Sequence, residues 1–328
     1  METINNNDDL INYYNFNEDA SCISVGTKTG FKIITCNPFT NHHNRKFNRG
    51  IGIVEMYHSS NILALTGCEN NSKFPCNKLV IWDDNKEEIL REIRFSSKIR
   101  IIKIIKDKLF IVNDLKILIL NFENLSLINS YELYLYKKEL ISFSVKKDTK
   151  IAYCSKNKKE IYINNIETKK EIKIINKNDE LDYEYLQFNS KGDILAAACE
   201  GKVILYKTSD GEIDREINNE SLKNGYINCV CFSNNDKFLA VSTIENNSGN
   251  INIFDIGTKE EKGIFDYFWN SEDKCLAFYN INCKEFIFRF DKDDSILIMT
   301  SNAEFIKISI DKENGGNCKK VKSKNVFN

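Results

Sequence analysis

The chain has 328 residues, of which 42% are hydrophobic, and its 46 basic and 47 acidic residues leave a formal net charge of -1. This length can enclose a sizeable core, and the balanced charge argues against nucleic acid or an anionic membrane as a partner recognised by bulk charge. The polar start METINNNDD has neither a secretory nor a transit pattern, and no run reaches the roughly 18 apolar residues of a membrane-spanning helix.

Short strand-like runs follow one another along the chain. Each is rich in β-branched, aromatic or aliphatic residues and ends at Asn, Asp, Gly, Lys or Ser, as strands bounded by turns do. In chain order they include CISVGT, GFKIIT, NILALTG, KLVIWD, KLFIVND, LKILILNF, KIAYCS, EIYINNI, DILAAAC, KVILYKT, KFLAVST, NINIFDI, SILIMTS and EFIKISI. No long segment has a competing helical period. The pattern predicts an all-β protein.

A repeat groups these strands. Phe188 and Phe232 occupy equivalent places in two similar segments, 44 residues apart, and a four-stranded propeller blade takes roughly 40–45 residues. A closed ring buries both faces of every blade. We therefore predict one seven-bladed β-propeller over residues 15–312, preceded by a disordered extension, 1–14, and followed by a basic, disordered tail, 313–328. The alternative is two packed sandwiches, against which the period argues. The expected blades lie near residues 15–36, 51–83, 93–122, 140–168, 183–208, 226–256 and 265–310.

Motifs for catalysis and cofactor binding are missing from the sequence. GIGIVE begins like a dinucleotide fingerprint but has Glu55 where the third glycine belongs, and GTKTGFK has the wrong spacing for a phosphate loop. There is no Gly-x-Ser-x-Gly elbow. We expect a protein that is not an enzyme and that has no cofactor.

Histidine, cysteine and paired acidic residues give no clear metal site. His42 and His43 lie in FTNHHNRKF, which we expect to be an exposed loop, and with Cys36 they still lack a fourth zinc ligand. Asp83 and Asp84 flank a strand, where a solvated turn is the default interpretation. The eleven cysteines are scattered and odd in number, which indicates reduced thiols in the cytosol.

Several segments, taken in order, resemble one family. FNEDASCISVGTKTGFKIITCNPF and GIGIVEMYHSSNILALTG resemble the first two blades of the PROPPINs, β-propellers known in animals as WIPI proteins. KLVIWDD is most similar to the WIPI subgroup that partners the autophagic lipid-transfer protein. LQFNSKGDILAAAC, CFSNNDKFLAVST and WNSEDKCLAFYN resemble blades five, six and the entry to blade seven. The resemblance implies a monomeric cytoplasmic scaffold in autophagy or endolysosomal traffic, able to associate peripherally with those membranes.

The resemblance also locates a lipid-binding motif. Family members bind phosphatidylinositol 3-phosphate and its 3,5-bisphosphate through two adjacent arginines that follow a hydrophobic residue and precede a glycine. Here Ile217 takes the hydrophobic place, Asn218 and Asn219 replace both arginines, and Glu220 replaces the glycine. Guanidinium groups hold phosphate through paired charged hydrogen bonds, whereas asparagine carries no charge and Glu220 would repel a phosphate. We predict that 3-phosphoinositide binding is weak or lost.

Supporting positions are altered too. Ser242 and Thr243 are kept, but Asn250 and Asn252 stand where the family has Thr and His. The blade-five turn, AAACEGK, is shortened and carries Cys199 and Lys202. The blade-six loop, which inserts apolar residues into the bilayer in family members, is expected here to be short and charged, at residues 255–263.

A partner site and two alternatives complete the expectations. Asn17 and Asp19 match the side of the propeller that contacts the lipid-transfer protein, although an Asn/Asp turn before a strand explains them equally well. In one alternative, Lys202, Arg215 and lysines of the tail bind anionic membrane, with a steep dependence on salt. In the other, the chain is a generic WD-repeat adaptor without a membrane role. We expect no nucleic acid partner.

Overall fold

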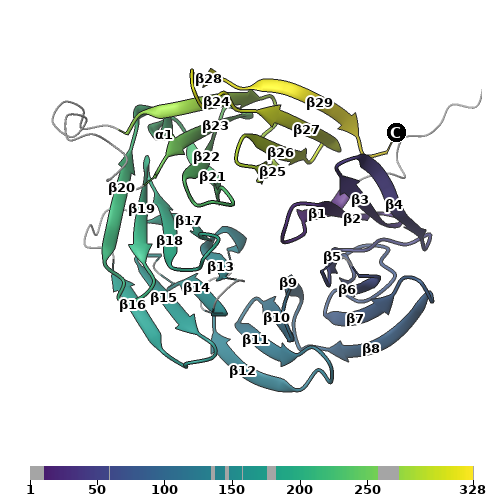
Figure 1. Ribbon diagram of the computed structural model, residues 1–328. Coiled ribbons are helices and arrows are strands. Elements are labelled where there is room, and N and C mark those ends of the chain that lie inside the picture. The colour runs from purple at the N-terminus through teal and green to yellow at the C-terminus, as the bar shows by residue number, and fades with distance from the viewer. Residues whose placement is uncertain are drawn as a thin grey trace, which may run out of the picture. The chain divides into compact units, whose positions relative to one another are not determined.

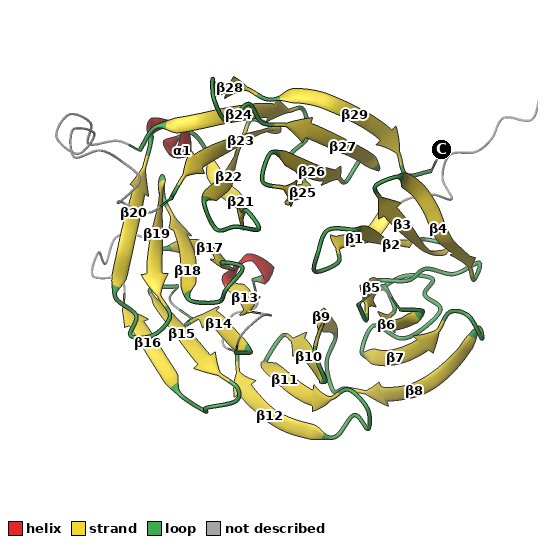
Figure 2. Cartoon of the chain, viewed as in Figure 1, coloured by secondary structure: helices red, strands yellow, loops and turns green. Residues whose placement is uncertain are grey.

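The computed structural model of the chain describes residues 11–58, 60–133, 137–144, 148–156, 158–175, 182–257 and 273–327. Its regular structure is almost entirely β, with one turn of 3₁₀ helix, η1 (Lys138–Leu140), and one short helix, α1 (Glu220–Lys223) (Figure 2). No helix in these ranges is long and apolar enough to cross a lipid bilayer. The strands form seven sheets, and the chain divides into two compact units.

Unit 1 comprises residues 1–136 and 324–328. It holds three four-stranded sheets, in which each strand pairs with the next one in the chain (Figure 1). The first strand of the middle sheet contacts the first strands of the other two. The strands are β1 (Ile11–Phe16), β2 (Cys22–Thr27), β3 (Gly30–Cys36) and β4 (Phe39–Lys46); β5 (Ile53–Met56), β6 (Ile62–Thr66), β7 (Lys78–Asp83) and β8 (Glu88–Arg94); β9 (Ile99–Ile105), β10 (Lys108–Asn113), β11 (Lys116–Asn121) and β12 (Leu127–Glu132).

Unit 2 comprises residues 137–323 and holds the other four sheets. Here too the first strand of each sheet contacts the first strand of the next. The strands are β13 (Ile141–Ser144), β14 (Lys150–Cys154), β15 (Glu160–Asn165) and β16 (Glu171–Ile175); β17 (Tyr183–Phe188), β18 (Ile194–Cys199), β19 (Lys202–Lys207) and β20 (Ile213–Asn218); β21 (Tyr226–Phe232), β22 (Phe238–Glu245), β23 (Ser248–Asp255), β24 (Cys275–Ile281) and β28 (Gly316–Asn317); β25 (Phe286–Lys292), β26 (Ser295–Thr300), β27 (Glu304–Ser309) and β29 (Lys319–Asn325).

Burial follows strand order within a sheet. Middle strands such as β18 and β26 are almost wholly buried, because a neighbouring sheet covers each of their faces, whereas the fourth strands β8 and β12 are mostly exposed. This explains why the second and third strands are continuous apolar runs in the sequence and do not alternate apolar with polar residues. One apolar cluster joins the β17–β20 sheet to the β21–β24 sheet, and includes Val203, Ile217, Leu222, Val230 and Phe254.

The structure corrects both predicted termini. The extension was expected to reach residue 14, but β1 begins at Ile11; residues 1–10 lie outside the described residues. The tail expected at 313–328 is not disordered, because Lys319–Asn325 form β29, which pairs as the outer strand of the β25–β27 sheet. The prediction of a disordered tail rested on the many lysines of this segment. An outer strand has one unpaired edge and can therefore carry such a polar sequence.

Two internal predictions are corrected as well. Blade seven was expected from residue 265, but CLAFYN forms β24 in the sixth sheet, and the seventh sheet begins at Phe286. FTNHHNRKF was expected to be a loop but forms β4 and the residue after it. Both errors concern fourth strands, which are less buried than the strands in the middle of a sheet and so have a weaker apolar signal.

Candidate functional site

The degenerate motif lies at the end of β20 and the start of α1. Ile217 is fully buried and pairs with Val203 of β19, so the hydrophobic place of the motif serves the core. Asn218 ends the strand, opposite Lys202. Asn219 is the N-cap of α1: its side-chain oxygen accepts hydrogen bonds from the backbone N–H of Ser221, at 2.9 Å, and from the Ser221 hydroxyl, at 2.6 Å. Asn219 therefore has a structural role that an arginine could not fill.

Asp273, just before β24, contacts this stretch through four polar groups. Its carboxylate forms an ion pair with Arg215 and accepts a hydrogen bond from the backbone N–H of Asn218 at 3.1 Å. Its backbone N–H donates to the Asn218 carbonyl oxygen at 2.9 Å, and its own carbonyl oxygen accepts from the Asn219 side-chain amide at 2.6 Å. Asp273 thus ties the motif in the β17–β20 sheet to the start of β24 in the next sheet.

Three cations that the structure describes at the motif are paired. Arg215 lies against Asp273, Lys202 places its amine 3.2 Å from the Glu216 carboxylate, and Lys223 pairs with Glu220 one turn of helix away. Each positive charge is therefore matched by a carboxylate next to it. A phosphate approaching this surface would meet no uncompensated positive charge among these cations.

The blade-five turn offers neutral and acidic groups. Cys199 is completely buried and pairs with Lys202 across the turn, and burial raises the pKa of its thiol to about 11. Glu184, on β17, accepts a hydrogen bond from the backbone N–H of Ile227 at 3.0 Å. Burial raises the pKa of Glu184, and the nearby carboxylate of Glu200 adds to the effect. These groups would not attract a phosphate.

The blade-six positions are brought together by strand pairing but face inward. Ser242 is fully buried, and its hydroxyl donates to the Cys229 carbonyl oxygen at 3.4 Å. Thr243, also buried, pairs with Asn250. The side-chain amide of Asn250 donates to the side-chain oxygen of Asn252 at 3.4 Å, and Asn252 is only 1% exposed. These side chains are uncharged, and Ser242 lies on the opposite face of the sheet from Thr243, Asn250 and Asn252.

The blade-six loop is longer than predicted. It was expected to be short, at residues 255–263, but β23 ends at Asp255 and β24, its neighbour in the same sheet, begins at Cys275. The prediction failed because the aromatic run after Gly263 was taken as the start of a new blade. The connection covers residues 256–274, of which 258–272 lie outside the described residues. A short loop is therefore not an argument against membrane binding.

Asn17 and Asp19 form the turn between β1 and β2. The Asn17 side chain accepts from the backbone N–H of Cys22 at 2.9 Å, and Asp19 accepts from the Ser21 hydroxyl at 2.6 Å. Partial burial alone would raise the pKa of Asp19, but the hydrogen bonds from Ser21 and Asn17 outweigh it and lower that pKa. Both residues also line a cavity of about 240 Å³. The rest of its lining is Glu18, Glu55, Met56, His58, Lys103 and Ile104.

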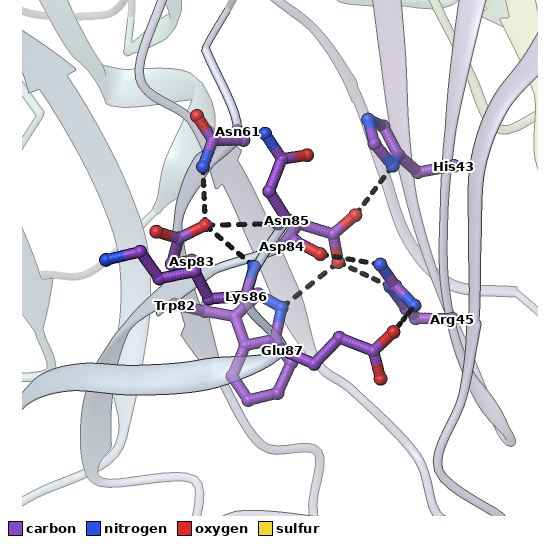
Figure 3. Close-up of polar contacts among 9 residues, drawn as sticks. All are labelled: His43, Arg45, Asn61, Trp82, Asp83, Asp84, Asn85, Lys86 and Glu87. Carbon is purple, nitrogen blue, oxygen red and sulfur yellow. Dashed lines mark hydrogen bonds and ion pairs between the residues drawn. The ribbon is translucent and has the colours of Figure 1, made fainter.

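A second polar cluster in unit 1 involves the acidic pair that was expected to be solvated. Asp83 and Asp84 are instead buried. The Asp84 carboxylate contacts Arg45 at 2.7 Å, His43 at 2.6 Å and the indole N–H of Trp82 at 3.1 Å (Figure 3). Burial lowers the pKa of His43, with His42 and Arg45 acting in the same direction and Asp84 opposing them. Since β4 and the β7–β8 turn supply these groups, the cluster holds two sheets of unit 1 together.

Comparison with known proteins agrees with this architecture. No model of a known protein family matches the chain. SVP1-like protein 2 of Schizosaccharomyces pombe is 43% identical over 91 residues, which are 27% of this chain and 25% of that protein. Autophagy-related protein 18 of Kluyveromyces lactis is 32% identical over 135 residues, 41% of this chain and 27% of that protein. The match thus spans about a quarter of the length of these curated relatives.

Solved structures extend the likeness to the whole chain. Hsv2 of Kluyveromyces lactis has a TM-score of 0.77 at 17% identity, over 97% of this chain and 99% of that one. KlAtg21, solved in complex with the coiled coil of AgAtg16, has a TM-score of 0.79 at 18% identity, over 96% and 99% of the two chains. The chain is thus similar in sequence to SVP1-like and Atg18 proteins and in fold to the Hsv2 and Atg21 propellers, in line with the PROPPIN resemblance of its sequence. The predicted seven-bladed β-propeller is confirmed.

Sequence reasoning missed the residues that shape the surface around the motif. Asp273 is 55 residues from Asn218, and nothing in the sequence pairs the two. Glu216 was overlooked because it precedes the motif and carries no family signature. Arg215 was considered as a cation, but its carboxylate partner was not foreseen. To place Asp273 beside the motif, one would have to know how β23 and β24 pair, residue by residue.

Proposed function

We propose that this chain is a non-catalytic PROPPIN scaffold that acts in autophagy or endolysosomal membrane traffic and has little specificity for 3-phosphoinositides. The similarity to autophagy-related protein 18 and to the Hsv2 and Atg21 propellers supports the first part. The second part rests on one observation, that two described cations beside the motif are already in ion pairs, Lys202 with Glu216 and Arg215 with Asp273. These pairs also weaken the alternative in which Lys202 and Arg215 replace the missing arginines.

Vesicle flotation tests the proposal. The full chain is mixed with phosphatidylcholine vesicles that contain phosphatidylinositol 3-phosphate, phosphatidylserine or neither. We expect no preference for the 3-phosphate over phosphatidylserine. A strong preference that is lost in an Asn218→Ala, Asn219→Ser variant would contradict the proposal; serine at position 219 keeps an N-cap, so a loss would not merely report an unfolded α1.

A second candidate function is membrane contact without headgroup recognition. The observation that favours it is the length of the 256–274 connection, whose sequence includes Phe265, Phe268 and Trp269. Aromatic residues favour the membrane interface. Flotation through these residues would survive high salt and would fall in a variant with serine at all three positions. Flotation through the lysines of β29 would instead fall steeply as salt rises.

A protein partner of the autophagic lipid-transfer type is the third element of the proposal. The cavity beside Asn17 and Asp19 supports it, because its acidic lining is open to charged groups of another protein. Affinity purification from the native cell should recover a lipid-transfer protein with the unmodified chain. Glu18→Lys should abolish its recovery, whereas Glu123→Lys, the same charge reversal at a turn outside the cavity, should not.

A further inference from the structure

The Asp273 carboxylate accepts from a set of hydrogen-bond donors that would also suit a phosphate. Its carboxylate oxygens accept from the Arg215 guanidinium and from the Asn218 backbone N–H at 3.1 Å. A guanidinium beside a backbone N–H is also the combination that binds phosphate oxygens in proteins. Arg215 is not one of the motif positions, so this pair of donors is distinct from the degenerate arginine pair.

We propose that Arg215 and the Asn218 N–H form an anion site for a phosphate monoester, and that the Asp273 carboxylate occupies it as an internal competitor. The inference rests on the proposed function, since it gives a reason for weak headgroup binding. An attached carboxylate has a high effective concentration at the site, so an external phosphate must displace it before binding.

Both charged groups can be reached from solvent. The Arg215 side chain is 24% exposed and that of Asp273 is 21% exposed. Neither Arg215 nor Asp273 belongs to the apolar cluster that contains Ile217. A phosphate could therefore contact Arg215 once the carboxylate is removed, without opening the core.

The backbone of Asp273 is held independently of its carboxylate. Its N–H donates to the Asn218 carbonyl oxygen, and its carbonyl oxygen accepts from the Asn219 amide. A substitution that removes only the charge should therefore leave residues 273 and 274 in place. Asp273→Asn and Asp273→Ser are two such substitutions, and either one that folds provides the test.

The experiment compares the full chain with Asp273→Asn on phosphatidylcholine vesicles that contain phosphatidylinositol 3-phosphate. Losing the competing carboxylate should raise vesicle binding by about tenfold. Adding Arg215→Gln to Asp273→Asn should abolish the gain. In a second arm, calorimetry with inorganic phosphate and with soluble inositol 1,3-bisphosphate shows whether the site also takes phosphate that is not on a lipid.

Asp291→Asn is the matched control. It removes the same charge from another partly buried ion pair of unit 2, with Lys307, in which the two side chains are 16% and 22% exposed. It should leave phosphate and vesicle binding unchanged. The proposal is overturned if no folded Asp273 variant gains binding in either arm, if the gain is equal on phosphatidylserine vesicles, or if it survives Arg215→Gln. A strong preference of the unmodified chain for the 3-phosphate would instead contradict the proposed function. The unmodified chain therefore tests the proposed function, and the Asp273 variants test the anion site.

Discussion

The side-chain amine of Lys32, in β3, donates a hydrogen bond to the carbonyl oxygen of Val326 at 3.3 Å, although 294 residues separate them. The same amine lies 4.6 Å from the centre of the Phe327 ring, and Val326 is only 1% exposed. Residues 324–328 thus pack into unit 1 although they follow the whole of unit 2 in the chain. The end of the chain is part of the unit 1 core.

Val326→Ala should therefore destabilise the protein. The lost methyl groups and the cavity left behind should lower the free energy of unfolding by about 1–3 kcal/mol, measured by chemical denaturation. Val321→Ala is the control, because Val321 lies on β29 but is 61% exposed. It should change stability by less than about 0.5 kcal/mol. Equal losses in the two variants would show that Val326 is not anchored in the core.

The buried Asp84 carboxylate should couple strongly to Arg45. Asp84→Asn removes the buried charge that faces the guanidinium and leaves it Glu87, which is more exposed, as its ionic partner. We expect a loss of about 2–4 kcal/mol in the free energy of unfolding. A double-mutant cycle with Arg45→Gln should give a coupling energy above about 1 kcal/mol. The Arg100–Asp114 pair, whose side chains are 33% and 41% exposed, serves as the comparison. Its coupling should stay below about 1 kcal/mol.

The propeller could be predicted from sequence because its middle strands carry a strong signal. Strands such as β18 and β22 lie between two sheets, so their apolar runs and the 44-residue spacing of Phe188 and Phe232 reveal the blade. The fourth strands carry no such signal. For that reason β4, β24 and β29 were read as a loop, as part of the next blade and as a tail.

The motif could be located from sequence, but its chemistry could not. Register alone places Asn218 and Asn219, and their lack of charge follows from their identity. That Asn219 caps α1 depends on a helix of only four residues, which is too short to leave a periodic pattern. The ion pair between Arg215 and Asp273 depends on the pairing of distant strands, which composition and spacing do not encode.

Glu184 should make stability depend on pH in a defined window. Burial raises its pKa above the ordinary value of 4.5, so the folded state holds this proton more tightly than the unfolded state. Its contribution is fully favourable below 4.5 and is lost as the pH rises through the folded pKa. Glu184→Gln should therefore raise the free energy of unfolding at pH 7, because glutamine carries no charge to bury.

The measurement is thermal unfolding of both proteins across the acid range. The advantage of Glu184→Gln should shrink as the pH falls and vanish below 4.5, where the glutamate is neutral in both states. Glu212→Gln, on an exposed turn of the same sheet, should give no such pH-dependent difference. A Glu184→Gln advantage that stays constant with pH would show that shape, not charge, is responsible.

Asn219 should stabilise the motif through two separable contacts. Asn219→Ala removes both the cap of α1 and the amide donor to Asp273, and should cost about 1–2 kcal/mol in the free energy of unfolding. Asn219→Asp keeps the capping oxygen and loses only the donor, so it should cost less. Asn219→Ser, which also keeps a cap, should behave like the aspartate variant. If alanine and aspartate cost the same, the cap is not what position 219 supplies, and asparagine there would be explained by its contact with Asp273 alone.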